Sequence, residues 1–101
     1  MALLLAAAAL LRSQAAAAET IQVTILNLVF SPAEVSAKIG DTIEWINKDA
    51  FLHTATARDG SFDVSIPPNK TATSTIQKGG EVAYYCRFHP NMTGQLRVGA
   101  H

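Results

Sequence analysis

Three potential metal ligands recur at every third residue near the C-terminus. In the segment CRFHPNM, Cys86, His89 and Met92 offer a thiolate, an imidazole and a thioether. A short loop between two strands would turn these side chains toward one point, and His53 could supply a fourth donor from upstream. Two imidazoles, a thiolate and a weak axial thioether suit copper, because the sulfur ligands favour Cu(I) and imidazole serves both Cu(I) and Cu(II). The pattern predicts one copper ion held by His53, Cys86, His89 and Met92.

Each of these residues also has an ordinary structural explanation. Single Cys and Met residues are common core fillers, and a lone His is more often structural than a ligand. The combination changes this balance, because a loop containing Pro90 and ending at Gly94 is a poor place for three unrelated core residues. The metal-site interpretation is therefore favoured over the core interpretation.

The first 18 residues have the pattern of a secretory signal peptide, which leaves residues 19–101 as one copper-binding domain. Residues 2–11 are an unbroken Ala/Leu run, and the alanines at 16–18 before Glu19 form a small-residue cleavage site. No Lys or Arg precedes the run, which departs from the usual pattern. The run is too short to span a bilayer as a helix, although an uncleaved anchor is an alternative. We expect an exported protein, periplasmic if the source is bacterial.

The net charge limits the kinds of binding partner that are expected, and the single cysteine limits the roles that Cys86 can have. Without Arg12, seven Lys and Arg residues stand against eight Asp and Glu, a formal net charge of about −1. This balance gives no reason to expect nucleic acid or an anionic membrane as a partner. An exported Cys without an intrachain partner is reactive, intermolecular or metal-bound, and metal ligation explains Cys86 best.

The domain reads as β-structure throughout. Apolar and polar residues alternate in several short runs separated by Gly, Pro and Asp turns, and no helical period appears after residue 18. Val82, Tyr84 and Cys86 share one face of a run, so Cys86 is expected to point into the interior. The prediction is an all-β, Greek-key sandwich of about seven to eight strands. The main runs lie at 21–25, 35–39, 43–45, 71–76, 82–86 and 96–98.

The mature chain resembles the cupredoxins, and within the plastocyanin/azurin family it most resembles the amicyanin branch. The two-residue gaps on both sides of His89 are the short ligand spacing typical of amicyanins. The other matching segments are FSP at 30–32, GDTIEWIN at 40–47, HTAT at 53–56, DGSFD at 59–63 and YYC at 84–86.

The resemblance implies a type 1, or blue, copper centre with Met92 as the long axial ligand. It also implies a one-electron carrier, not an enzyme, that works between redox partners docking transiently near His89. We expect a monomer without an integral membrane segment in the mature domain. A rigid β-scaffold fits this role, because one compromise geometry limits rearrangement between Cu(I) and Cu(II). Phe51, Leu52, Phe88 and Pro90 could form an apolar collar on which such partners dock.

Three positions near the ligands carry further expectations. Asn47 matches a residue that in amicyanins ties the first-histidine loop to the ligand loop. Thr54 stands where many cupredoxins have Asn, so its shorter side chain leaves the link between these loops in question. Phe88 replaces the proline that amicyanins usually have before the second histidine, and its N–H could donate a second hydrogen bond to the Cys86 sulfur.

Three other classes of protein compete with the electron carrier. A copper oxidase or nitrite reductase would need a second copper or a substrate site, for which only His101 is left among the histidines. A copper delivery or storage protein would use the same soft ligands but would release the metal readily. A purely structural sandwich would tolerate Cys86→Ser with little change.

Overall fold

The computed structural model describes residues 17–100, and these residues form nine strands and no helix. The predicted signal peptide over residues 1–18 lies, up to residue 16, outside the described residues. The strands are β1 (Thr20–Leu26), β2 (Val29–Ser31), β3 (Glu34–Lys38), β4 (Thr42–Asn47), β5 (His53–Ala57), β6 (Asp63–Ile66), β7 (Thr71–Thr75), β8 (Gly80–Cys86) and β9 (His89–Gly99).

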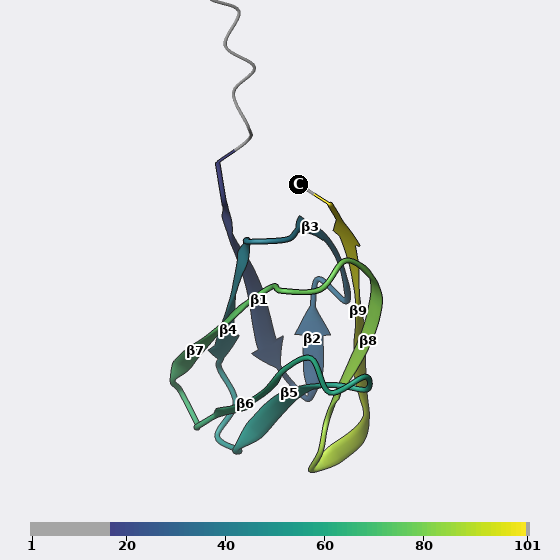
Figure 1. Cartoon of the computed structure of the whole chain (residues 1–101). Helices are drawn as coiled ribbons and strands as arrows, with labels where there is room; N and C mark the ends of the chain where they lie inside the picture. The colour runs from purple at the N-terminus through teal and green to yellow at the C-terminus, as the bar shows by residue number, and fades with distance from the viewer. Residues whose placement is uncertain (1–16, 101) are drawn as a thin grey trace, which may run out of the picture.

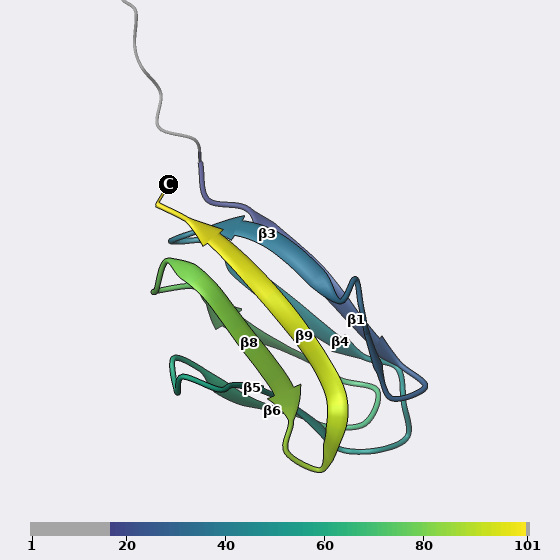
Figure 2. The same ribbon diagram turned by 90° about the vertical axis from the view of Figure 1, so that its right-hand side faces the viewer.

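The strands form two sheets that pack face to face (Figure 1). One sheet has the order β2-β1-β4-β7, and the other has the order β3-β9-β8-β5-β6. β1 runs parallel to β4, and β3 runs parallel to β9, whereas the other pairs are antiparallel. Figure 2 shows β3, β9 and β8 side by side across the front of the molecule. The predicted all-β sandwich is confirmed.

The strand count exceeds the predicted seven to eight because short strands give weak patterns. β2 has only three residues, and β6 is a four-residue strand that follows the turn at Gly60. The prediction also began the last strand after Gly94, whereas β9 begins at His89 and spans 11 residues. Most of the segment expected as a ligand loop is therefore strand.

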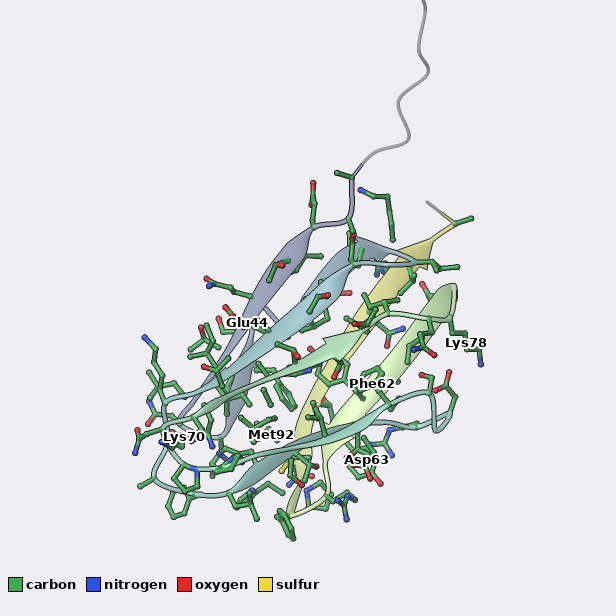
Figure 3. All side chains as sticks on the ribbon, turned by 60° about the vertical axis from the view of Figure 1, so that its left-hand side comes forward. Glu44, Phe62, Asp63, Lys70, Lys78 and Met92 are labelled. Carbon is green, nitrogen blue, oxygen red and sulfur yellow. The ribbon has the colours of Figure 1, made fainter. Side chains whose placement is uncertain are left out.

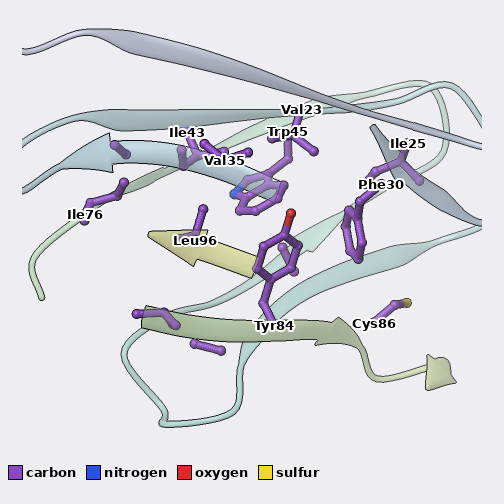
Figure 4. Packing of buried hydrophobic residues seen from close by; sticks show 14 of the residues in the cluster. Val23, Ile25, Phe30, Val35, Ile43, Trp45, Ile76, Tyr84, Cys86 and Leu96 are labelled. Atoms are coloured by element: carbon purple, nitrogen blue, oxygen red, sulfur yellow. The ribbon is translucent and has the colours of Figure 1, made fainter. Parts of the chain in front are cut away.

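The core is built from the alternating positions that the sequence marks as inward-facing. Trp45, Tyr84 and Phe30 pack edge to face at its centre, with ring centroids 4.9–5.8 Å apart (Figure 4). Gly94 pairs with Tyr84 across β8 and β9, and a Cβ at Gly94 would overlap the Tyr84 ring. This close approach explains why a glycine interrupts β9.

Different loops lie at the two ends of the sandwich, and the predicted ligands lie at only one of these ends. The turns that precede β4 and β8 lie at the end near the C-terminus (Figure 1). The β1–β2 turn, the loop over residues 48–52 and the β8–β9 turn gather at the opposite end. The predicted ligands lie at this opposite end, which we call the ligand end.

A search of residues 17–100 finds no helix that is both long and apolar enough to span a membrane.

Candidate metal centre

Cys86 is the last residue of β8, and its side chain is completely buried. It lies on the same strand face as Val82 and Tyr84, which are also buried, because alternate residues of a strand share a face. Figure 4 shows the Cys86 sulfur beyond the aromatic core, at the end of the strand. The predicted inward direction of Cys86 is confirmed, and the thiol is free.

A tight turn and a bulge connect Cys86 to the other two predicted ligands of this segment, His89 and Met92. Cys86 pairs with His89 across only two turn residues, whereas the next pair is Tyr85 with Thr93. Residues 90–92 are therefore extra residues in β9, and such bulges commonly re-aim side chains beside functional sites. Met92 lies within this bulge and is buried toward the ligand end (Figure 3).

His53, Cys86 and His89 converge on one point. The Cys86 Sγ lies 3.7 Å from the His53 Nδ1 and 3.7 Å from the His89 Nδ1. All three donor atoms lie within 4.8 Å of one another. Such separations are those expected of donors that each lie about 2.0–2.3 Å from a shared ion. The sequence prediction that these three side chains meet is thus confirmed by their positions.

Thr54 links the strand of the first histidine to the turn between the other ligands. Its backbone N–H donates to the Cys86 Sγ at 3.4 Å, and its hydroxyl accepts the Arg87 N–H at 2.9 Å. The same hydroxyl lies 2.9 Å from the Thr56 hydroxyl, which donates to Asp63 at 2.8 Å. Thr54 therefore does bridge the two ligand segments, despite its short side chain. Among the described residues, the backbone N–H that donates to the sulfur is that of Thr54, and the Phe88 N–H does not provide the predicted second donor.

Asn47 has a different role from the one that the resemblance implied. Its amide nitrogen donates to the backbone carbonyls of Phe51, at 2.7 Å, and Ile66, at 2.9 Å. Its Oδ1 accepts the Asp49 N–H at 2.9 Å. Asn47 thus fixes the shape of loop 48–52 and ties it to the end of β6, whereas the link to the ligand turn comes from Thr54.

Asp49 is a buried carboxylate in contact with a predicted ligand, and sequence reasoning missed it. Its Oδ2 lies 2.8 Å from the His53 Nε2, and its oxygens also accept the N–H groups of Asn27 and Leu28. Burial alone would raise the pKa of Asp49, but the hydrogen bonds from Leu28, His53 and Asn27 outweigh it and lower that pKa. The carboxylate is therefore ionised at neutral pH. Its only sequence signal is its place four residues before His53.

Apolar side chains surround the half-buried His89. Phe51 is 56% exposed and Phe88 is 52% exposed, so both belong to the surface and not to the core. The Phe51 ring centroid lies 6.2 Å from that of His89. Leu52, which the sequence also assigns to the collar, is 42% exposed.

Comparisons with known proteins agree with this site. The family model of the cupredoxin-like domain matches residues 1–98. Amicyanin-alpha of Methylorubrum extorquens is 33% identical over 100 residues, which cover 93% of this chain and 84% of that protein. Chloroplastic plastocyanin of Tetradesmus obliquus is 27% identical over 85 residues, 70% of this chain and 59% of the plastocyanin. The chain belongs to the cupredoxin family.

Solved structures support the same assignment. The reduced Cu(I) form of an amicyanin variant at pH 4 superimposes with a TM-score of 0.70 at 27% identity, covering 86% of this chain and 87% of that one. The prediction that the chain is not an enzyme is confirmed by its relatives, which include amicyanins and a plastocyanin.

Proposed function

We propose that this chain is an exported type 1 copper protein that carries single electrons between redox partners. The observation that carries this proposal is the convergence of the His53, Cys86 and His89 donor atoms within 4.8 Å at one end of a rigid sandwich. The similarity to amicyanins, including one with a structure of its Cu(I) form, supports copper as the metal.

The donor set fits copper better than zinc or a hard cation. His53, Cys86 and His89 would hold the metal through two imidazoles and one thiolate, and the buried Met92 would add a weaker thioether ligand. Copper bound there would supply a one-electron couple between Cu(I) and Cu(II). A structural zinc site would be expected to have at least two cysteines, whereas Cys86 is the only cysteine of the chain.

The protein's own contribution is to hold the donors nearly still. His53 and Cys86 are completely buried and belong to neighbouring strands, β5 and β8. Thr54 joins these strands at the level of the ligands through its amide and its hydroxyl. Because little backbone needs to move between the two oxidation states, electron transfer would meet a small reorganisation barrier.

The apolar collar suits a short-lived complex with a redox protein. The exposed Phe51 lies beside the half-buried His89, and the exposed Leu52 and Phe88 directly precede the two histidines in the chain, so a partner that docks there would approach the edge of the centre. A small apolar contact favours a weak complex that dissociates quickly. We further propose that the protein is monomeric and that residues 1–18 direct its export.

An optical spectrum of the Cu(II)-loaded protein tests the proposal. Thiolate coordination to Cu(II) should give an intense red absorption that ascorbate bleaches, and Cys86→Ser should abolish it. Met92→Leu should keep a coloured site with a changed potential, because the axial contact is weak. A colourless Cu(II)-loaded wild type would contradict the assignment.

A further inference from the structure

Two buried aspartates close the two ends of the same pair of parallel strands. β1 and β4 pair from Thr20–Thr42 to Ile25–Asn47, a constant offset of 22 residues. At one end Asp41 accepts the Glu19 N–H at 2.9 Å, and at the ligand end Asp49 accepts the Asn27 N–H at 2.7 Å. The same offset separates the partners in both contacts. We call the two aspartates the Asp41 clamp and the Asp49 clamp.

Each clamp also accepts a second backbone N–H, but only one of them contacts a candidate ligand. Asp41 receives the Lys38 N–H at 2.9 Å, and Asp49 receives the Leu28 N–H at 3.0 Å. Asp49 has in addition the His53 Nε2 at 2.8 Å. Both aspartates are almost fully buried. Asp49 thus makes the same kind of backbone contacts as Asp41, and in addition it contacts His53 of the candidate metal centre.

The β1–β2 turn, which belongs to the same sheet as β4, holds Asp49 in place. Asn27 and Leu28 both have positive φ angles, of 53° and 62°, as a tight two-residue hairpin turn requires. Leu28 is an unfavourable residue for that conformation, and the carboxylate offsets its cost by accepting both turn amides. Because the turn fixes both oxygens, the direction from which Asp49 meets His53 is also fixed.

We propose that Asp49 is a positioning residue of the metal centre, which sets the tautomer and orientation of His53. Both Asp49 oxygens accept backbone N–H groups, so Oδ2 acts as an acceptor toward His53 as well and the ring proton is on Nε2. The lone pair of His53 is then on Nδ1, which is the atom that faces the Cys86 sulfur at 3.7 Å. A carboxylate partner of this kind also makes the ligating nitrogen a stronger donor. The proposal rests on the proposed function, because it assigns His53 as a ligand.

The first test compares Asp49→Asn with Asp41→Asn, its matched control. Asparagine keeps the size of the side chain, but one of its ends is a donor and cannot accept from all three N–H groups. We expect Asp49→Asn to weaken copper binding by about 10–100-fold in competition with a chromophoric Cu(I) chelator. Asp41→Asn removes the corresponding clamp at the other end and should leave the affinity unchanged. Equal affinities in the two variants would overturn the proposal.

The second test needs no metal and no variant. Nitrogen-15 NMR of the histidine rings in the metal-free wild type should show His53 as a single tautomer with its proton on Nε2, protected from exchange with water. In Asp49→Asn the His53 signals should shift toward the other tautomer, whereas in Asp41→Asn they should not. A His53 ring with its proton on Nδ1 in the wild type would overturn the proposal, even if Asp49→Asn failed to fold.

The two tests separate this inference from the proposed function. If the wild type binds no copper, the proposed function fails, whereas the tautomer of His53 still reports on the Asp49 contact. If the wild type binds copper with a red absorption and both variants bind it equally well, the function stands and the positioning role of Asp49 is refuted.

Discussion

The Asp41 clamp and the Asp49 clamp solve the same folding problem at opposite ends of one strand pair. A parallel pair cannot be closed by a hairpin, so the first unpaired amide beyond each end of β1 needs another acceptor. A buried aspartate beside β4 provides it in both cases. The difference lies in the neighbours, because Asp41 meets only backbone amides, whereas Asp49 also meets His53.

This difference shows how a carboxylate that stabilises the fold can also orient a metal ligand. The Asp49 carboxylate is already buried and fixed by two amides of the β1–β2 turn. Adding His53 to it therefore gives a pre-oriented donor without new buried charge beyond the carboxylate itself. At the other end, Asp41 accepts only backbone N–H groups and so contributes to stability alone. Variants of Asp41 therefore serve as controls for variants of Asp49.

Copper loading should produce the largest effect, and only through the ligand end. A metal that binds the folded state alone stabilises it by about 2.7 kcal/mol at a free concentration 100 times its dissociation constant. We expect Cu(I) to raise the midpoint of thermal unfolding of the wild type and of Asp41→Asn by similar amounts, measured by circular dichroism. If Cu(I) did not raise the unfolding midpoint of Asp41→Asn, copper binding at the ligand end would depend on the Asp41 end, contrary to this account.

Acid should reveal the contribution of the Asp41 clamp. The amides of Glu19 and Lys38 lower the pKa of Asp41 below its ordinary value of 3.8, although burial opposes them. A lowered pKa stabilises the native state above the unfolded value, and this stability is lost as the pH falls through and below about 4. In urea titrations of the metal-free protein between pH 6 and about 2, Asp41→Asn should be less stable at pH 6 and should show a flatter decline.

Asp59 provides the reference for the acid experiment. Hydrogen bonds from the side chain and amide of Ser61, and then from Lys78, lower the pKa of Asp59 to about 2. Because this group remains in Asp41→Asn, some loss of stability on acidification should persist in that variant. Identical pH profiles for the wild type and Asp41→Asn would contradict the role given to the Asp41 carboxylate.

Thr54→Val tests whether the ligand end depends on a hydroxyl as well as on a carboxylate. The valine has the same shape but cannot accept the Arg87 N–H, which would cost about 1–3 kcal/mol if that donor found no other partner. We expect a lower urea midpoint for the metal-free protein, with the red band of the copper form retained, because the Thr54 amide still donates to the sulfur. Thr54→Ser keeps a hydroxyl and should therefore lose less stability than Thr54→Val. An equal loss in the two variants would contradict a stabilising hydrogen bond between the Thr54 hydroxyl and the Arg87 N–H.

Phe88→Pro should have the smallest effect. The proline removes the Phe88 N–H, but the sulfur receives its backbone hydrogen bond from Thr54. The midpoint potential should therefore change by less than one hydrogen bond is worth, about 0.5–1.5 kcal/mol or about 20–65 mV for one electron. Voltammetry of the two proteins in one buffer measures the difference. A fall of that full size would mean that the Phe88 amide reaches the sulfur in the copper protein.

The sequence predicts the sandwich from local patterns, and it predicts that His53 meets Cys86 and His89 because these residue types together form a copper donor set. Alternation of apolar residues marks the strands, and the parity of Val82, Tyr84 and Cys86 gives the direction of the thiol. Binding of the metal, with Met92 as its fourth ligand, stays a prediction. The patterns are too short to mark β2 or the start of β9 at His89.

The contacts around the ligands could not be predicted because they join segments distant in the sequence. Asp49 meets Asn27 only because β1 and β4 pair in parallel with a fixed register. The hydroxyl of Thr54 reaches the Arg87 amide only because β5 and β8 are neighbours. Residue types and spacing specify which donors are available, whereas strand register decides which polar groups hold them.

The measurement that tests the central claim most directly is repeated oxidation and reduction of the copper-loaded protein in the presence of a Cu(I) chelator. An electron carrier should recover its full red absorption after every cycle of ascorbate and ferricyanide, because the buried His53 and Cys86 keep the metal in both states. A copper delivery or storage protein would lose Cu(I) to the chelator, and the red band would fall with each cycle. Retention of copper and colour is the result that we predict, and progressive transfer of copper to the chelator would contradict it.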